Sequence, residues 1–467
     1  MNQQGDQFIA IVGMACRFAG CRDLKSFWLR VLNGVPAFSD YPDASAHRFL
    51  LENQASFSHV SSLKAGYLGD LWQVRSSSVT IPQAALAGTN PEFPLAAELA
   101  LLALRDAGVL GSAIPHDRIG VIAGYSPGLD PATVGWCQHG LMVDQAMDLV
   151  RRCFPHGKPE EFDALRANLV AALPEYDSRN ISWLLHHSLA SVIAGKCDIN
   201  GPAYCVNAGE ISSQAAIQAA CDALRDGRLD AVLAGAVNGL VTPQVLMPYS
   251  KMGLVSKLGA VHPFGRAADG TLFGEGGGFL VLKRYDDAVR DDDRVYALVR
   301  ACGMASDGNA RHVEGAIASA VKRAWHNAPS EINTIDLLEA NGAGVPGVDR
   351  AEIKAMNALM NSPSPLPSES IALGSVKALV GHCGAASGIA STIKAALALY
   401  HRVIPPAQEA GQAAEVLHLQ ETPFYLNPRP RPWIHNDAGP ARRAGITSLS
   451  VGGGAAHLVL EQVSYKP

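Results

Sequence analysis

Residues 201–216 read GPAYCVNAGEISSQAA, and this stretch decides the fold. An apolar strand runs through a tight turn into a helix of small residues, and the turn presents Glu210 at the start of that helix. Residues 371–400 repeat the order of strand, turn and small-residue helix, with His382 in the turn. Helices without bulky side chains can approach one another closely and lie in the middle of a protein. Two such units predict a duplicated α/β architecture.

The rest of the chain alternates strand and helix patterns, which predicts a mainly parallel sheet covered by helices. The expected strands are residues 8–14, 119–123, 231–235, 279–282, 295–299, 335–338, 371–374 and 458–460, and the expected helices are residues 94–107, 211–225 and 388–400. Residues 36–83 lack periodicity and are interpreted as surface loops and short elements. Residues 127–179 contain amphipathic helices such as 159–173 and are interpreted as a cap or an insertion on the dimer side. No flexible linker divides the chain, so we expect two halves, residues 1–255 and 256–467, in one compact body.

The composition narrows the class of protein. The 467 residues include 48% hydrophobic residues, 17% charged residues and 45 glycines, which suits an α/β enzyme fold. The net charge of −5 and the lack of Lys/Arg runs argue against nucleic-acid binding, so we expect a small-molecule or protein partner. Neither a secretory signal nor an apolar run of about 20 residues occurs, so we expect a cytoplasmic protein without a membrane span. Nine cysteines without a CxxC pair indicate reduced thiols and argue against zinc, and no cofactor is expected.

Several motifs resemble the β-ketoacyl synthase domains of polyketide and fatty-acid synthases. They are IAIVGMACRF at residues 9–18, PFGRAADGTLFGEG at 263–276, GSVK at 374–377 followed by GH at 381–382, TPFYLN at 422–427 and HLVLE at 457–461. The resemblance covers nearly the whole chain in order. It implies a thiolase-like fold, with two duplicated halves in a five-layered αβαβα core, and usually a dimer. The sequence of residues 173–194 looks most like the corresponding part of synthases from polyunsaturated-fatty-acid and related iterative systems.

The resemblance also assigns catalytic positions. In that family a cysteine takes the acyl chain and two histidines polarise the incoming malonyl thioester. The cysteine position is Glu210 here, and the first histidine position is Asn341 within EANGAGVP at residues 339–346. The second histidine is retained as His382, as are Lys377 and its expected acidic partner Glu352.

The acyl entrance implied by the resemblance is changed as well. The family pattern GFGGTNAH reads SVGGGAAH at residues 450–457. The aromatic gate is therefore Val451, and the Thr-Asn pair is Gly454-Ala455. We expect Val451, Gly453 and Gly454 at the substrate-binding positions, and each loss there removes a substrate contact.

These substitutions favour a catalytically silent protein. Condensation needs a nucleophile that forms and then releases a thioester, whereas Glu210 would have to form a mixed anhydride. Cys205 is no substitute, because it lies in the apolar strand and is interpreted as a packing thiol. The favoured hypothesis is a subunit that resembles a chain-length factor and pairs with a cysteine-bearing ketosynthase served by an acyl carrier protein; a homodimer is the alternative assembly. Glu210 could then hydrogen-bond His382 or form an ion pair across an interface.

The alternative is a malonyl-carrier-protein decarboxylase, or another non-condensing enzyme that acts on carrier-bound acyl groups. Decarboxylation needs only donors aimed at the enolate oxygen, which His382 and the Asn341 amide could supply. An ionised Glu210 at about 4 Å from the malonyl carboxylate would cost on the order of 4 kcal/mol at an effective dielectric near 20. A neutral Glu210 that faces a cavity would favour decarboxylation, whereas a charged and paired one would favour a structural partner.

Overall fold

The computed structural model describes residues 8–42, 49–52, 58–72, 90–126, 131–173, 185, 187–239, 241–308, 313–326, 332–361, 365–435 and 439–463. Its main sheet has eleven strands in the order β10-β8-β7-β12-β13-β6-β1-β5-β4-β2-β3. Their bounds are β1 Ile9–Phe18, β2 Ile119–Gly124, β3 Ala203–Val206, β4 Ala231–Asn238, β5 Gly276–Arg284, β6 Ala297–Ser306, β7 Leu337–Glu339, β8 Ile371–Gly374, β10 Phe424–Leu426, β12 Arg443–Leu449 and β13 Gly454–Glu461. Strands β9 (Val403–Ile404) and β11 (Arg431–Pro432) form a separate small sheet.

The main sheet consists of two halves with the same strand pattern. In the first half β3, β2 and β4 are parallel, and β5 and β1 follow antiparallel. In the second half β8, β7 and β12 are parallel, and β13 and β6 follow antiparallel. The halves meet where β1 pairs antiparallel with β6. This repetition confirms the duplicated α/β architecture predicted from the two strand-turn-helix units.

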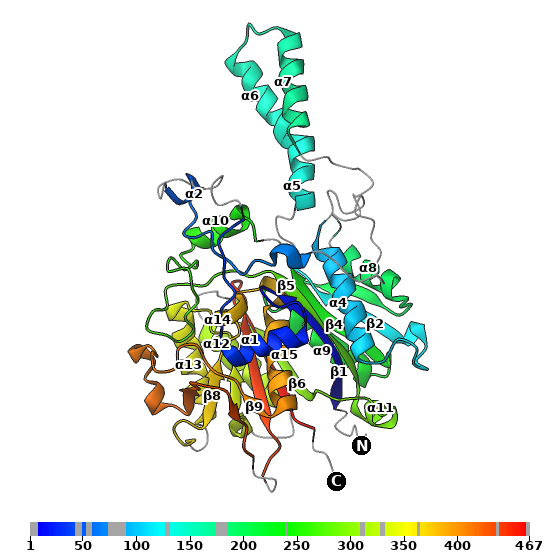
Figure 1. Cartoon of the computed structure of the whole chain (residues 1–467), viewed down its shortest axis with the longest axis vertical. Coiled ribbons are helices and arrows are strands. Elements are labelled where there is room, and N and C mark those ends of the chain that lie inside the picture. Colours follow the sequence, from blue (N-terminus) through cyan, green and yellow to red (C-terminus); the bar gives the residue numbers. More distant parts are fainter. Residues whose placement is uncertain are drawn as a thin grey trace.

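Two central helices pack closely between the halves, α9 (Ser212–Arg225) and α15 (Ser387–His401). A Cβ atom added to Gly388 would lie 2.0 Å from Oε1 of Gln214, so a larger residue there would hold the two helices apart. Helices α4 (Glu92–Asp106) and α8 (Ser188–Cys197) cover the outer face of the first half, and α12 (Val313–His326) and α13 (Pro346–Met360) lie on the second half (Figure 1). The small residues of α9 and α15 thus allow the expected five layers: outer helices, one half of the sheet, the central helices, the other half of the sheet and outer helices.

The remaining helices are shorter or lie outside these layers. They are α1 Leu24–Asn33, α2 Phe49–Glu52, α5 Pro131–Cys137, α6 Val143–Cys153, α7 Pro159–Ala171, α10 Pro243–Lys251, α11 Tyr285–Arg290 and α14 Lys377–Val380; single turns are η1 Gly69–Trp72, η2 His116–Arg118, η3 Gln138–Met142, η5 Ile332–Thr334, η6 Gly384–Ala386, η7 Glu415–Leu417 and η8 Leu419–Glu421. Across the described ranges, no helix has both the length and the apolar character that crossing a membrane requires.

Each strand and helix expected from the sequence is present, although β6 continues seven residues beyond the expected end at 299. The expectation of a mainly parallel sheet is wrong, because β1, β5, β6 and β13 form antiparallel pairs in the middle of the sheet. The described part of residues 36–83 contains only α2 and η1, and the rest of that region lies outside the described residues. The predicted helix at 159–173 is α7, and Figure 1 shows α6 and α7 standing away from the body of the molecule. The division of the chain after residue 255 stays a prediction; β5, which follows that point, pairs with β1 and β4.

Candidate functional site

The candidate site lies where the two strand-turn-helix units meet. Glu210 follows β3 at the start of α9, and His382 lies between α14 and α15. The turn before Glu210 is closed by Ser212, whose Oγ accepts the Ala208 N–H at 2.9 Å and donates to the Gly209 carbonyl at 2.6 Å. Gly209 has a φ of +62°, a left-handed conformation that glycine adopts without a steric penalty. The turn therefore leaves the side chain that follows it half-buried, beside the loop that carries Ser450 and Val451.

The Glu210 carboxylate is held by the loop at residues 449–454. Its Oε2 accepts a hydrogen bond from Ser450 Oγ at 2.6 Å and from the Val451 N–H at 3.2 Å. The loop is itself a tight turn, because the Ser450 N–H donates to the Gly454 carbonyl at 2.8 Å and the Gly453 N–H donates to the Ser450 carbonyl at 2.9 Å. Two donors converging on one oxygen suit an ionised carboxylate. The predicted substrate-binding positions thus form the loop that binds Glu210.

The hydrogen bond expected between Glu210 and His382 is absent from the contacts of these two described residues. The His382 ring is buried, and its Nδ1 accepts the Gly384 N–H at 3.2 Å, with Ser387 Oγ at 3.4 Å. Burial and, after it, the nearby Lys377 charge lower the His382 pKa to about 4, against the opposing negative charge of Glu210. At neutral pH the ring is therefore uncharged. Because Nδ1 is an acceptor, the ring hydrogen is on Nε2, which can serve as a donor.

Asn341 is buried, and its side-chain amide has one defined orientation. Its Oδ1 accepts hydrogen bonds from Lys377 Nζ at 3.1 Å and from the Leu449 N–H at 3.2 Å. Two donors to the same atom identify it as the oxygen. The other amide atom, Nδ2, has no hydrogen-bond partner among the described residues, so it is the available donor at this position.

Lys377 and Glu352 act on Asn341 from two sides and do not contact each other directly. Lys377 Nζ donates to the Asn341 carbonyl at 2.8 Å, whereas Glu352 accepts the Asn341 N–H at 2.8 Å and the Gly342 N–H at 3.0 Å. No nitrogen–oxygen contact of ion-pair length joins these two described side chains, so Glu352 acts on Lys377 as a nearby negative charge that opposes the lowering of the Lys377 pKa by burial. Burial raises the Glu352 pKa to about 7 and lowers that of Lys377. Both residues therefore position the loop that carries Asn341.

Three groups that shape the site were not predicted from the sequence. Ser450 supplies the shorter hydrogen bond to Glu210, although its place in the glycine-rich motif beside Val451 was a usable signal. Asp349 is buried and accepts the Phe264 N–H at 2.9 Å and the Ala343 N–H at 3.0 Å, and burial raises its pKa to about 7. The buried Glu339 forms an ion pair with Lys394 at 2.5 Å. Its place in the motif that contains Asn341 was a usable signal for a supporting carboxylate.

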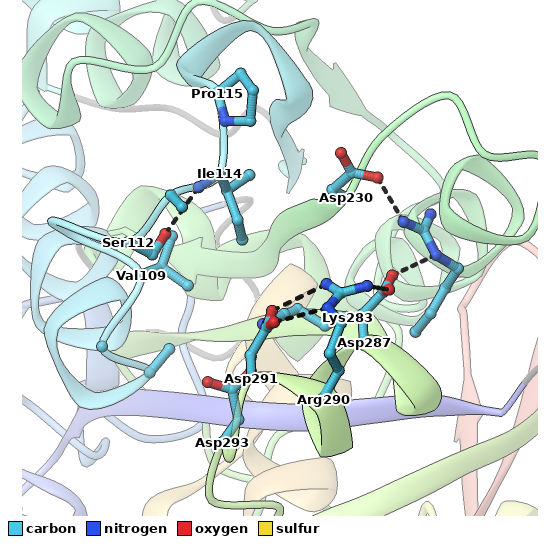
Figure 2. Close-up of a pocket in the computed structure, with 14 residues that line it drawn as sticks. Val109, Ser112, Ile114, Pro115, Asp230, Lys283, Asp287, Arg290, Asp291 and Asp293 are labelled. Atoms are coloured by element: carbon cyan, nitrogen blue, oxygen red, sulfur yellow. Dashed lines mark hydrogen bonds and ion pairs between the residues drawn. The ribbon is translucent and has the colours of Figure 1, made fainter.

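A second set of charged groups surrounds a pocket of about 600 Å³ (Figure 2). Asp230 at its edge precedes the first residue of β4, whereas Glu210 follows the last residue of β3, and both strands run parallel to β2. The pocket therefore lies at the opposite end of the first half of the sheet. Lys283 Nζ donates to Asp291 at 2.7 Å and also to Asp293.

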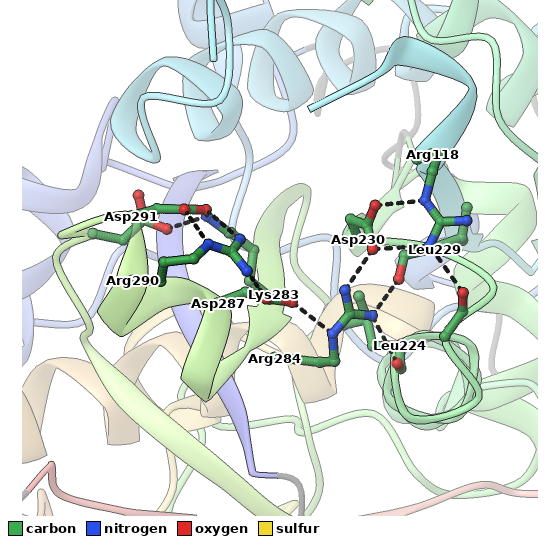
Figure 3. Close-up of polar contacts among 11 residues, drawn as sticks. Arg118, Leu224, Leu229, Asp230, Lys283, Arg284, Asp287, Arg290 and Asp291 are labelled. Carbon is green, nitrogen blue, oxygen red and sulfur yellow. Dashed lines mark hydrogen bonds and ion pairs between the residues drawn. The ribbon is translucent and has the colours of Figure 1, made fainter. Parts of the chain in front are cut away.

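The arginines beside this pocket are paired as well (Figure 3). Arg284 bonds Asp287 at 2.6 Å, Asp230 and two main-chain carbonyls, and Arg118 also donates to Asp230. The Arg118 hydrogen bond is the largest cause that lowers the Asp230 pKa to about 2. Because these cations already have carboxylate partners, this network ties β4, β5 and α11 together and offers no free cation to a ligand among the described residues. The same residues contain no cluster of His, Cys, Asp and Glu that could hold a metal ion.

Comparison with known proteins identifies relatives over the whole chain. Residues 6–288 match the family model for the N-terminal domain of β-ketoacyl synthase, and residues 296–410 match that for its C-terminal domain. A polyunsaturated fatty acid synthase polypeptide of Thraustochytrium sp. is 29% identical over 99% of this chain and 16% of its own length. A phenolphthiocerol/phthiocerol polyketide synthase polypeptide of Mycobacterium tuberculosis is 30% identical over 98% of this chain and 27% of its own length. The chain thus spans less than a third of the length of these relatives.

Solved structures share the fold. The PfaC keto synthase-chain length factor superposes with a TM-score of 0.79 at 25% identity, over 98% of this chain and 48% of that one. An oxazolomycin ketosynthase domain of Streptomyces albus gives a TM-score of 0.79 at 26% identity, over 98% of this chain and 75% of that one. With the two halves described above, these likenesses establish the thiolase-like fold.

Proposed function

We propose, from the premise that this chain belongs to the β-ketoacyl synthase family, that it is a non-condensing subunit which pairs with a cysteine-bearing ketosynthase, as a chain-length factor does. The observation that carries the proposal is the Glu210 carboxylate bound by Ser450 and the Val451 N–H. In this proposal, Glu210 stands at the position of the family's nucleophile. Its side chain permanently fills the position in which the acyl group would bind, called here the seat.

The chemistry of Glu210 supports a loss of condensation. A carboxylate that accepts two hydrogen bonds is a weaker nucleophile than a free one, and its acyl product would be an anhydride instead of a thioester. In the proposed arrangement, its two donors are groups that an acyl oxygen at this seat would need for stabilisation. Because Glu210 already uses them, an acyl group would have to displace a charged side chain before it could bind. The seat is therefore closed to acyl loading in this arrangement.

The surroundings support a structural role for the polar residues that remain. Asn341 Oδ1 is bound by Lys377 and by the Leu449 N–H, so this side chain joins the 341–344 loop to the end of β12. The similar proteins include a polyunsaturated fatty acid synthase and a keto synthase-chain length factor, which favours this class of assembly. In the proposed complex an acyl carrier protein would deliver its acyl chain to the cysteine-bearing ketosynthase.

The test is co-purification with a cysteine-bearing ketosynthase from the same pathway. We expect a stable complex, and we expect ketosynthase products of altered length when this chain is left out. Glu210→Gln should preserve both the complex and the product length, because no reaction occurs at residue 210. An untagged ketosynthase that never co-purifies, or products that do not depend on this chain, would overturn the proposal.

One observation favours decarboxylation as a second candidate. The uncharged His382 carries its hydrogen on Nε2, and Asn341 Nδ2 is an available donor, so both groups demanded by enolate stabilisation exist. The assay incubates the protein with malonyl carrier protein and measures acetyl carrier protein. His382→Ala should abolish turnover. Glu210→Gln should raise the turnover rate, because it removes a negative charge that repels the malonyl carboxylate. No turnover by either the natural protein or Glu210→Gln rejects this candidate.

A further inference from the structure

The position of His382 depends on main-chain groups from two short segments. The His382 N–H donates to the Leu272 carbonyl at 2.7 Å, and the His382 carbonyl accepts the Gly274 N–H at 3.1 Å. The ring nitrogen Nδ1 accepts the Gly384 N–H at 3.2 Å. The residues just before β5 therefore hold the main chain of His382, and the turn at Gly384 holds its ring.

Asn238, the last residue of β4, contacts both of these segments. Its Nδ2 donates to the Gly274 carbonyl at 2.7 Å, which fixes the orientation of the side-chain amide. Its Oδ1 lies against Gly384, because a Cβ atom added to Gly384 would be 2.2 Å from this oxygen. Asn238 belongs to the first half of the sheet, whereas His382 belongs to the second strand-turn-helix unit. One side chain thus ties the two halves together beside His382.

The Gly384 contact decides which ring nitrogen of His382 carries the hydrogen. A neutral imidazole has one donor and one acceptor nitrogen, so an N–H that points at Nδ1 requires the hydrogen on Nε2. The Phe273 ring, centred 5.6 Å from the His382 ring, packs against it in the same way in either tautomer. Ser387 Oγ, at 3.4 Å from Nδ1, can donate or accept and therefore fits both tautomers. Among these described neighbours, only the Gly384 N–H selects the Nε2–H tautomer.

We infer that Asn238 is a positioning residue that keeps the Gly384 turn in place and thereby fixes the hydrogen of His382 on Nε2. Without this amide, the Gly274 carbonyl loses its side-chain donor and Gly384 loses the atom that it packs against. A small displacement is sufficient, since the Gly384 N–H already binds Nδ1 at a long distance, 3.2 Å. This role of Asn238 rests on the second candidate function and deepens it, because a donor aimed at the enolate oxygen needs the hydrogen on Nε2.

Nitrogen NMR of protein with isotope-labelled histidine measures the tautomer directly. The chain has 15 histidines, and the His382 signals are those that disappear in His382→Gln. Burial and, after it, the Lys377 charge lower the His382 pKa to about 4, so at neutral pH these signals report the tautomer of an uncharged ring. We expect the Nε2–H tautomer in the natural protein. In Asn238→Ala both nitrogen signals should shift toward each other, as the two tautomers exchange.

Asn427→Ala is the matched control. Asn427 is buried and also donates from Nδ2 to main-chain carbonyls, those of Ile404, Pro405 and Arg429. None of these carbonyls belongs to the segments that hold His382. Asn427→Ala should therefore lower the thermal stability of the protein and leave the His382 signals where they are.

Asn238→Asp keeps the test decisive if Asn238→Ala fails to fold. Aspartate has the size of asparagine, but it replaces the donor to the Gly274 carbonyl by an acceptor. We expect the His382 nitrogen signals to shift in the same direction as in Asn238→Ala. A single Nε2–H tautomer in every folded Asn238 variant, or the same shift in Asn427→Ala, would overturn the positioning role.

The NMR spectra require neither a substrate nor a partner, so their outcome is separate from that of the proposed function. Absence of turnover by Glu210→Gln would reject the decarboxylase candidate and leave the tautomer measurement standing. Where Glu210→Gln does turn over malonyl carrier protein, adding Asn238→Ala should lower kcat by roughly tenfold or more with KM unchanged, because a transition-state donor is lost. An unchanged kcat in that double variant would also overturn the role of Asn238.

Discussion

Replacing Lys377 with methionine tests how the site is supported. Lys377 is almost fully buried, and its ammonium group donates to the Asn341 carbonyl at 2.8 Å and to Asn341 Oδ1 at 3.1 Å. Neither acceptor would be orphaned, because Ser375 Oγ also donates to that carbonyl at 3.1 Å and the Leu449 N–H also donates to Oδ1 at 3.2 Å. Methionine fills much of the same volume.

The expected loss is therefore intermediate. Each hydrogen bond from a charged donor contributes about 1.5–3 kcal/mol, but methionine removes the cost of burying an ammonium group that has no carboxylate of the described residues within ion-pair distance. We expect Lys377→Met to lower the free energy of unfolding by about 2 kcal/mol. Lys394→Met is the matched control, because Lys394 is buried in a direct ion pair with Glu339 at 2.5 Å. Leaving that carboxylate unpaired should cost about 3–5 kcal/mol.

Urea unfolding followed by tryptophan fluorescence measures both values, since the chain has six tryptophans. We predict that Lys394→Met loses more stability than Lys377→Met. If Lys377→Met were the less stable of the two, Lys377 would have to be the direct counter-ion of a carboxylate, and its assignment as a main-chain anchor of the Asn341 loop would be wrong. An unchanged free energy of unfolding for Lys377→Met would refute the anchoring role itself.

Three further outcomes are expected. Gly388→Ala should destabilise the protein by about 1–3 kcal/mol, because its Cβ would lie 2.0 Å from the Gln214 side chain. Gly195→Ala, which meets nothing within 4 Å in α8, should be neutral or stabilising in the same thermal-unfolding assay. Ser450→Ala should release the carboxylate that it binds at 2.6 Å and speed hydrogen exchange in the 449–454 loop, with protection unchanged in α15 as the control. The stability that the natural protein has over Glu352→Gln should decrease as pH rises. The folded-state pKa of Glu352, about 7, lies above its usual value of 4.5, so the protonated carboxyl contributes about 3 kcal/mol to the free energy of unfolding. That contribution is complete below pH 4.5 and is lost as the pH rises through 7. A flat difference across that range would exclude a raised pKa.

The fold could be predicted because its main determinants are local. Small residues in two helices predicted their close approach, and the contact between Gly388 and Gln214 confirms it. Alternating strand and helix patterns likewise predicted most strands of the sheet, but β10 and β12 were not predicted. The surroundings of α7 were harder to predict, since its amphipathic pattern at 159–173 has an apolar face, whereas α7 has no buried residue. Periodicity identifies an apolar face but not the molecule that covers it.

The partners of Glu210 could not be predicted, because they come from a loop 240 positions away in the sequence. Local pattern cannot show which distant loop closes over a turn. The expected alternative, a hydrogen bond to His382, is absent from the contacts of these described residues, and the Glu210 carboxylate is bound by Ser450 and the Val451 N–H instead. The expected partnership of Lys377 with Glu352 is indirect, since both side chains bind main-chain groups at Asn341 and each acts on the other only through its charge. Main-chain partners leave no signature in the types of residues that bind them.

Those main-chain contacts give Lys377 and Glu352 a structural role that is independent of catalysis. Lys377 and Glu352 hold the Asn341 loop through its carbonyl and its N–H groups, and neither contact depends on an acyl chain. Removal of the Glu352 carboxylate would take an acceptor from the buried Asn341 and Gly342 N–H groups whether or not the site is catalytic. The presence of Lys377 and Glu352 is therefore equally compatible with a silent site and an active one. The residues that discriminate are Glu210, whose two donors favour a closed site, and Asn341 and His382, whose available donors favour chemistry. The Glu210→Gln substitution removes the charge that closes the site and leaves the donors of Asn341 and His382 unchanged. Measuring decarboxylation by this variant therefore separates the two functions.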